Sequence, residues 1–147
     1  MALLKVCACP TCRNLVEYPN VFCKEHEDSD KQRYKQYKAT RTDKKEQALY
    51  KSAIWYSVKE SVISSCFGID IYKFYTENLI ETVELVHHII EVKEDWNKRL
   101  DTDNLIALTE ESHSKIHHIY NQSKEAKKEC QAMLRQFKQR FDKEFRF

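Results

Sequence analysis

Five of the six histidines of this chain lie in one stretch, residues Glu84–Tyr120, which reads ELVHHIIEVKEDWNKRLDTDNLIALTEESHSKIHHIY. These five histidines form two clusters: His87 and His88, then His113, His117 and His118. Asn104 lies between the clusters, after an aspartate. Imidazoles gathered in this way are typical of a metal site with a base beside it.

The local pattern around each cluster predicts its secondary structure. His87 and His88 follow a short apolar and β-branched run, which predicts the end of a strand. Neighbouring side chains of a strand point to opposite faces, so these two histidines are expected to have different roles. His113 and His117 are spaced i, i+4 in a segment without Gly or Pro, which predicts one face of a helix. With Asn104 opening a second short strand, the predicted order is strand, loop, strand, helix.

Two helical imidazoles and one from a strand suit a three-ligand metal site that leaves positions open for water and substrate. His118 lies about 100° around the helix from His117 and is expected to point away from that site. A single histidine on an apolar strand is more often a hydrogen-bonded core residue. Packing alone, however, does not easily produce an HH pair, a DN dipeptide and an HxxxH pair together.

In this order, HHII, DNLIAL and HSKIH resemble the HNH (His-Asn-His) endonuclease motif, which is carried by a ββα-metal finger. The segment is similar to small phage-encoded members, and the resemblance covers Tyr50–Tyr120. It implies a general base at His88 and, at Asn104, a residue that fixes the base and its loop by hydrogen bonding. The metal ligands that it implies are His87, His113 and His117. It also implies one divalent ion (Mg, Mn, Ni or Zn) and a monomer that nicks double-stranded DNA.

The sequence departs from many members of this family at two places. Those members hold a structural zinc with two CxxC pairs, one before the HH strand and one before the final helix. This chain has only Cys66 at the first place, and Thr109 and Ser112 stand at the second. The core zinc is therefore expected to be absent. Glu91 replaces the usual proline after the second isoleucine, and neither departure touches a catalytic position.

The segment Val6–His26 contains four of the six cysteines and the remaining histidine. Thiolate and imidazole ligands around Zn²⁺ would stabilise a loop too small to bury a core. Cys9 and Cys12 have a common zinc-knuckle spacing, so Cys9 competes with Cys7 as the first ligand. Small HNH nucleases often carry an N-terminal finger of the form C-x4-C, loop, C-x2-H, which implies one structural zinc on Cys7, Cys12, Cys23 and His26. A disulfide framework is disfavoured because no signal peptide places the chain in an oxidising compartment.

Residues 31–45 carry seven positive charges against one acid, Asp43, with Tyr34 and Tyr37 interleaved. Such a stripe suits phosphate contacts with aromatic stacking, although most charge runs are solvated helices or linkers. We call these seven basic residues the basic stripe, and they are the candidate DNA-binding residues: Lys31, Arg33, Lys35, Lys38, Arg41, Lys44 and Lys45.

The whole chain of 147 residues has one Gly, two Pro and 33% charged residues, which favours helix over sheet. We expect a mostly helical α+β protein with four parts: a zinc-binding finger (1–27), a basic helical linker (28–46), an HNH nuclease core (47–121) and a C-terminal helix (122–147). Residues 47–64 are expected to form one amphipathic helix and residues 66–80 an irregular connection. The C-terminal helix is expected to pack on the core or to form a dimer seam. Its basic face, with Lys127 and Lys138 among others, is a further candidate for DNA contact, although a solvated face is the default expectation.

No apolar run approaches the roughly 20 residues that a membrane span needs, and the N-terminal MALLKV is too short for the apolar region of a signal peptide. We therefore expect a soluble protein in the cytoplasm of a bacterial host cell, encoded by a phage. The function predicted is that of a metal-dependent HNH endonuclease acting on DNA. The alternatives are a non-catalytic zinc-finger DNA-binding protein and a partner of a phage packaging motor (terminase); a homodimer is a further candidate assembly.

Overall fold

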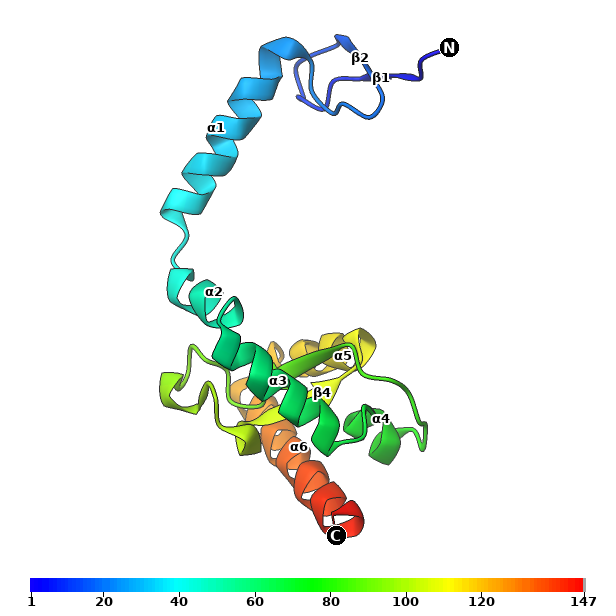
Figure 1. Cartoon of the computed structure of the whole chain (residues 1–147), viewed down its shortest axis with the longest axis vertical. Helices are drawn as coiled ribbons and strands as arrows, with labels where there is room; N and C mark the ends of the chain where they lie inside the picture. Colours follow the sequence, from blue (N-terminus) through cyan, green and yellow to red (C-terminus); the bar gives the residue numbers. More distant parts are fainter. Residues whose placement is uncertain (147) are drawn as a thin grey trace. The chain divides into compact units, whose positions relative to one another are not determined.

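The computed structural model describes residues 1–146, apart from the side chains of residues 29 and 30. The chain divides into two compact units, Met1–Lys44 and Lys45–Phe147 (Figure 1). The first unit joins the cysteine-rich segment to most of the basic stripe, and the second contains the histidine clusters and the C-terminal helix. The mostly helical α+β class expected from the sequence is confirmed. Of residues 1–146, no helical segment combines the length and apolar character needed to cross a bilayer.

The first unit consists of a short hairpin followed by a helix. Strands β1 (Leu4–Val6) and β2 (Leu15–Glu17) pair antiparallel, and α1 (Lys24–Thr40) begins directly after Cys23. Its buried core is small, with Val16 packed beside two cysteines. So little buried apolar area offsets only a fraction of the chain entropy, and a unit of this size ordinarily needs a metal or disulfides for stability.

The second unit opens with three helices: α2 (Lys44–Tyr50), α3 (Ala53–Ser65) and α4 (Ile71–Thr76). The single helix expected over 47–64 is therefore wrong, because Ser52 ends the continuity by capping α3: its side chain accepts a hydrogen bond from the Trp55 amide. The irregular connection expected over 66–80 is also wrong in part. Asp70 caps α4 through the Lys73 amide, which allows one short helix to form there.

A two-stranded sheet and two helices complete the second unit. Strand β3 (Leu85–His88) pairs antiparallel with β4 (Leu105–Leu108), with His87 opposite Ile106 and His88 opposite Leu105. The long connection between the strands contains two short 3-10 turns, η1 (Trp96–Lys98) and η2 (Thr102–Asn104). Helix α5 (Glu110–Tyr120) follows β4 at once, and α6 (Lys124–Phe145) closes the unit. Strand β4 is buried along its whole length, so it forms the centre of the core.

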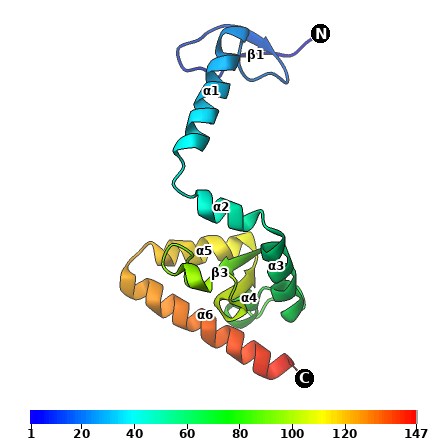
Figure 2. The ribbon, with the colours of Figure 1, turned by 60° about the vertical axis from the view of Figure 1, so that its left-hand side comes forward.

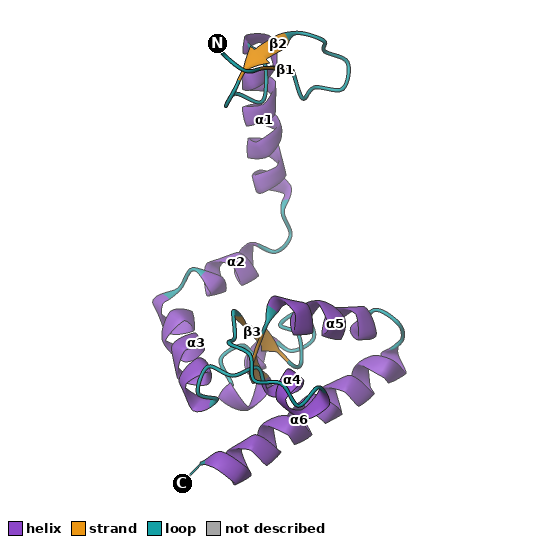
Figure 3. Cartoon of the chain, turned by 90° about the vertical axis from the view of Figure 1, so that its right-hand side faces the viewer, coloured by secondary structure: helices purple, strands orange, loops and turns teal. Residues whose placement is uncertain are grey.

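Helix α6 packs on the core and contacts α4 and α5 (Figures 2 and 3). Leu134 is fully buried and Phe141 nearly so, which bears out the expected core packing of this helix. Lys138 is also buried, and its ammonium donates to the carbonyls of Thr102 and Leu105. Neither the solvated face expected by default nor the candidate DNA contact applies to Lys138, because its ammonium is buried and donates to backbone carbonyls just before and at the start of β4.

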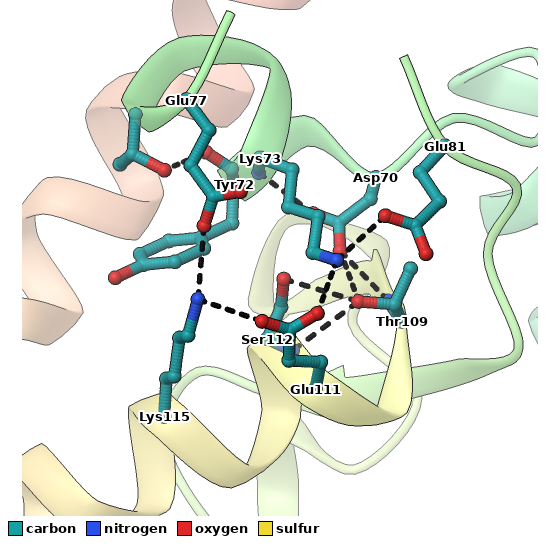
Figure 4. A network of polar contacts seen from close by, with 10 residues as sticks. Asp70, Tyr72, Lys73, Glu77, Glu81, Thr109, Glu111, Ser112 and Lys115 are labelled. Atoms are coloured by element: carbon teal, nitrogen blue, oxygen red, sulfur yellow. Dashed lines mark hydrogen bonds and ion pairs between the residues drawn. The ribbon is translucent and has the colours of Figure 1, made fainter. Parts of the chain in front are cut away.

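A buried polar network joins α4 to the start of α5 (Figure 4). Asp70 is fully buried, and its carboxylate accepts hydrogen bonds from the Thr109 amide and hydroxyl, both at 2.8 Å. Lys73 is 2% exposed and lies 2.6 Å from the carboxylates of Glu81 and Glu111. Thr109 is the N-cap of α5, so this network sets where the helix with His113 and His117 begins.

Candidate metal centre and its base

Three histidines from two elements converge at one end of the β3–β4 sheet. The ligand atoms of His87, His113 and His117 all lie within 4.8 Å of one another. His113 Nε2 and His117 Nε2 are 3.0 Å apart, because the i, i+4 spacing stacks the two side chains on one face of α5. Nitrogen ligands of one ion at about 2.1 Å are roughly 3 to 3.5 Å apart, so the donor set fits a divalent metal after a small adjustment.

The protonation states of these imidazoles favour metal binding. Burial, followed by the neighbouring His113 and His117, lowers the pKa of His87 to about 3. Burial also lowers the pKa of His113. A neutral imidazole is the form that binds a metal ion. At neutral pH, His87 and His113 are therefore in the form that can coordinate a metal. Tyr120 lies beside His87: its hydroxyl donates to the Ile89 carbonyl at 2.7 Å and lies 3.5 Å from His87 Nε2.

His88 occupies the same cleft but is held differently. Its Nε2 lies 2.9 Å from the carbonyl oxygen of Arg99, and since a carbonyl only accepts, Nε2 carries the proton. The lone pair is therefore on Nδ1. The indole of Trp55 stacks on the ring at 5.0 Å with an interplanar angle of 15°, and burial lowers the pKa of His88. The result is a neutral imidazole with a fixed orientation and its lone pair on Nδ1, which is what a general base requires.

Asn104 fixes the loop that follows β3. Its side-chain carbonyl accepts from the Ile90 amide at 2.8 Å, and its amide donates to the carbonyls of Ile90 at 3.0 Å and Lys98 at 3.4 Å. These bonds connect the beginning and the middle of the long connection to the start of β4. The expected role in fixing the loop thus has a structural basis, whereas Asn104 reaches His88 only through the backbone that it holds.

The four histidines line one cleft with a volume of about 590 Å³. Other parts of the second unit complete its wall. Their side chains are Glu46, Tyr50, Trp55, Lys59, Glu91 and Lys93, with apolar residues of β3 and the loop. Glu91 was noted in the sequence as the replacement of a proline, and Tyr50 and Trp55 belong to the segment YKSAIW, which resembles a YxSxxW helix of phage HNH members. No motif in the sequence identifies Lys59 or Lys93 as cleft residues.

A second group of potential ligands lies in the first unit. The ligand atoms of Cys7, Cys12, Cys23 and His26 all lie within 4.8 Å of one another. The Cys12 and Cys23 sulfurs are 3.8 Å apart, which matches the separation of about 3.8 Å for two thiolates on one tetrahedral zinc. Hydrogen bonding to His26 lowers the pKa of Cys23 to about 6, toward the thiolate form that binds zinc. Cys9 instead lies 3.9 Å from the Thr11 hydroxyl, outside this group.

The residues of the basic stripe differ in their exposure and in their contacts. Four of them lie along α1 with exposed side chains: Lys31, Arg33, Lys35 and Lys38. Arg41 is half-buried and forms a bidentate pair with Asp43 at 2.5 and 2.7 Å, so much of its charge is compensated. Lys45 lies 4.1 Å above the Trp96 ring in the second unit. Lys44 is exposed at the start of α2.

Comparison with known proteins gives two matches. The model of a domain of unknown function, DUF8602, matches residues 1–48. The chain is similar to a crystal structure of the HNH endonuclease of the deep-sea thermophilic bacteriophage GVE2 with manganese ion, at 26% sequence identity and a TM-score of 0.48. That match covers 63% of this chain and 90% of the phage protein. No curated protein matches the sequence significantly.

Proposed function

We propose that this protein is a metal-dependent endonuclease of the HNH type that hydrolyses phosphodiester bonds of DNA. One observation carries the proposal: three imidazoles converge within 4.8 Å of one another in a cleft that also holds His88, an imidazole with a tethered Nε2 and a free Nδ1. A metal site beside a neutral, oriented base is the combination that phosphodiester hydrolysis requires.

In this mechanism His88 Nδ1 takes a proton from a water molecule, and that water attacks the phosphorus in line with the leaving 3′ oxygen. The bond from Nε2 to the Arg99 carbonyl and the stacked Trp55 fix the orientation of the His88 ring, which lines the cleft. A divalent ion on His87, His113 and His117 would supply charge stabilisation for the phosphate and the leaving oxygen. Asn104 keeps the loop in place through Ile90 and Lys98.

The substrate proposed is double-stranded DNA, nicked by a monomer. One cleft cuts one strand, so neither a homodimer nor a terminase partner is needed for a nick. The exposed lysines of α1 would add phosphate contacts without sequence preference. With the resemblance to phage enzymes, the site of action proposed is the cytoplasm of the infected bacterial cell.

A non-catalytic zinc-finger DNA-binding protein is the rival function. The cysteine cluster and the basic helix of the first unit fit it equally well. The rival function gives no reason for a neutral His88, bound to the Arg99 carbonyl, beside the group His87, His113 and His117 of the second unit. Plasmid cleavage separates the two functions.

The test is conversion of supercoiled plasmid to open circles with Mg²⁺, Mn²⁺, Ni²⁺ or Zn²⁺. His88→Ala should lose about 10²- to 10⁴-fold in rate, the usual contribution of a general base, while Mn²⁺ binding stays near normal. His113→Ala and His117→Ala should weaken Mn²⁺ binding and cleavage together, because each removes a ligand. His118→Ala is the matched control, since that histidine is exposed on the same helix. Wild-type cleavage by His88→Ala, or no cleavage with any ion, would contradict the proposal.

A further inference from the structure

His117 presents its two ring nitrogens to different surroundings. Its Nε2 lies 3.0 Å from His113 Nε2, inside the group of potential ligands. Its Nδ1, on the other side of the ring, lies 3.8 Å from Oε1 of Glu91. Both side chains are about one third exposed, so water screens this pair only in part. A carboxylate therefore faces the ring nitrogen that points away from the metal site.

The Glu91 carboxylate is held in place from α6. Lys127 Nζ lies 2.6 Å from Glu91 Oε2 and 3.0 Å from the carboxylate of Glu94. The Glu94 carboxylate in turn accepts from the Glu91 backbone amide at 3.1 Å and from Gln131 at 3.2 Å. Side chain and backbone of Glu91 are thus both fixed, although the residue lies in a loop. One carboxylate oxygen is engaged by Lys127 and the other faces His117.

A carboxylate at this place determines which nitrogen of His117 carries the proton. A histidine ligand almost always donates its second N–H to a carboxylate, a carbonyl or a water, which fixes the tautomer and the ring orientation. The 3.8 Å between His117 Nδ1 and Glu91 Oε1 is longer than a hydrogen bond. A movement of the two atoms toward each other by about 1 Å would form one. The 3.0 Å between His113 Nε2 and His117 Nε2 fits two lone pairs that converge on one ion. A proton on His117 Nδ1, attracted by Glu91, leaves the lone pair on His117 Nε2.

We propose that Glu91, anchored by Lys127, is a positioning residue that keeps His117 in the Nδ1–H tautomer, with its Nε2 lone pair directed at the metal ion. This inference rests on the proposed metal site. It gives α6 a role in metal binding, although none of the three ligands lies on that helix. A merely structural role for Glu91 and Lys127, as a clamp between the loop and α6, would affect stability and leave the tautomer of His117 unchanged.

The first test is titration of the full-length protein with Mn²⁺, which disfavours thiolate ligands and so reports on the histidines rather than the cysteines. Glu91→Ala should bind Mn²⁺ about 10- to 100-fold more weakly than wild type. Lys127→Met should also bind more weakly, and Glu91→Gln should lie between Glu91→Ala and wild type, because an amide oxygen can still accept from Nδ1. Glu129→Gln and Lys128→Met are the matched controls, both exposed on α6. His113→Ala identifies the binding that belongs to this site.

The second test reads the tautomer directly from the ¹⁵N chemical shifts of the His117 ring without metal. Wild type and the two controls should show the Nδ1–H form, and Glu91→Ala should shift the ring toward the Nε2–H form. If Glu91→Ala is not folded, Glu91→Gln and Lys127→Met provide both readouts. Mn²⁺ affinity and ring shifts equal to wild type in the Glu91 and Lys127 variants would overturn this inference alone. A wild-type protein with no Mn²⁺ binding sensitive to His113→Ala would overturn the proposed metal site together with it.

Discussion

Replacing Asp70 with alanine should strongly destabilise the unit that contains the histidine cleft. The carboxylate is fully buried and accepts three hydrogen bonds, from the Lys73 amide and from the amide and hydroxyl of Thr109. Without it, the Thr109 amide has no acceptor in its buried position, and α4 loses its N-cap. The Thr109 hydroxyl keeps two contacts with Ser112: it lies 3.2 Å from the Ser112 hydroxyl and accepts from the Ser112 amide at 3.2 Å.

The magnitude follows from the two groups that lose their partner. A buried donor left without an acceptor costs about 1 to 3 kcal/mol, and loss of an N-cap costs about 1 kcal/mol. Since the Thr109 hydroxyl retains Ser112, it adds little. The expected loss is therefore about 3 kcal/mol in the free energy of unfolding. For a unit of this size, that corresponds to a fall in melting temperature of roughly 12 to 24 °C.

Urea unfolding followed by tryptophan fluorescence measures this loss in the second unit, because both tryptophans, Trp55 and Trp96, lie there. Asp101→Ala is the matched control: its carboxylate also accepts from a backbone amide, that of Asp103 at 3.0 Å, but the residue is exposed. The control should lose no more than about 1 kcal/mol. Equal unfolding midpoints for Asp70→Ala and Asp101→Ala would refute the reasoning and mean that water replaces the buried carboxylate.

Two predictions concern the first unit. Cys12→Ser should lower the zinc content of the reduced full-length protein by one equivalent and unfold the finger. Cys9→Ser should keep the zinc, because the Cys9 sulfur lies outside the ligand group. Metal analysis of the two variants measures this difference, and a wild-type protein without zinc would refute the site. Replacing Lys31, Lys35 and Lys38 with Gln should flatten the dependence of log K on log salt for DNA binding by about 0.9 per lost phosphate contact, and an unchanged slope would leave α1 as a solvated helix.

Sequence reasoning was most successful where a side chain's position depends on local geometry. The spacing of His113 and His117 determines their shared face on any helix, and alternation along β3 separates His87 from His88. The choice between Cys7 and Cys9 could not be made in this way, because it depends on where the chain returns with Cys23. Spacing typical of a family favoured Cys7, and the structure brings Cys7 into the ligand group.

Segments whose structure depends on a distant partner were predicted less well. Residues 66–80 contain an aromatic-rich stretch after Gly68, and the N-cap Asp70 is the local helix signal there. Helix α4 forms because Asp70 caps it and also accepts a hydrogen bond from the amide of Thr109, which is far along the chain. The connection between β3 and β4 is ordered by Asn104 in the same way, through Ile90 and Lys98. Such contacts become visible only when the strands are paired.

The helical spacing of two lysines in α6 already places them on its apolar face, but their charge favoured the prediction of a DNA contact. Lys138 follows Leu134 at i+4 and precedes Phe141 by three residues, so helical geometry alone puts it on the apolar face. Lys127 lies on the same side, four residues before Gln131, which is buried. A long lysine stem can lie along apolar surface while its ammonium reaches polar groups. In this protein those groups are the carbonyls of Thr102 and Leu105 for Lys138 and the carboxylate of Glu91 for Lys127, so both lysines bind groups of the second unit itself.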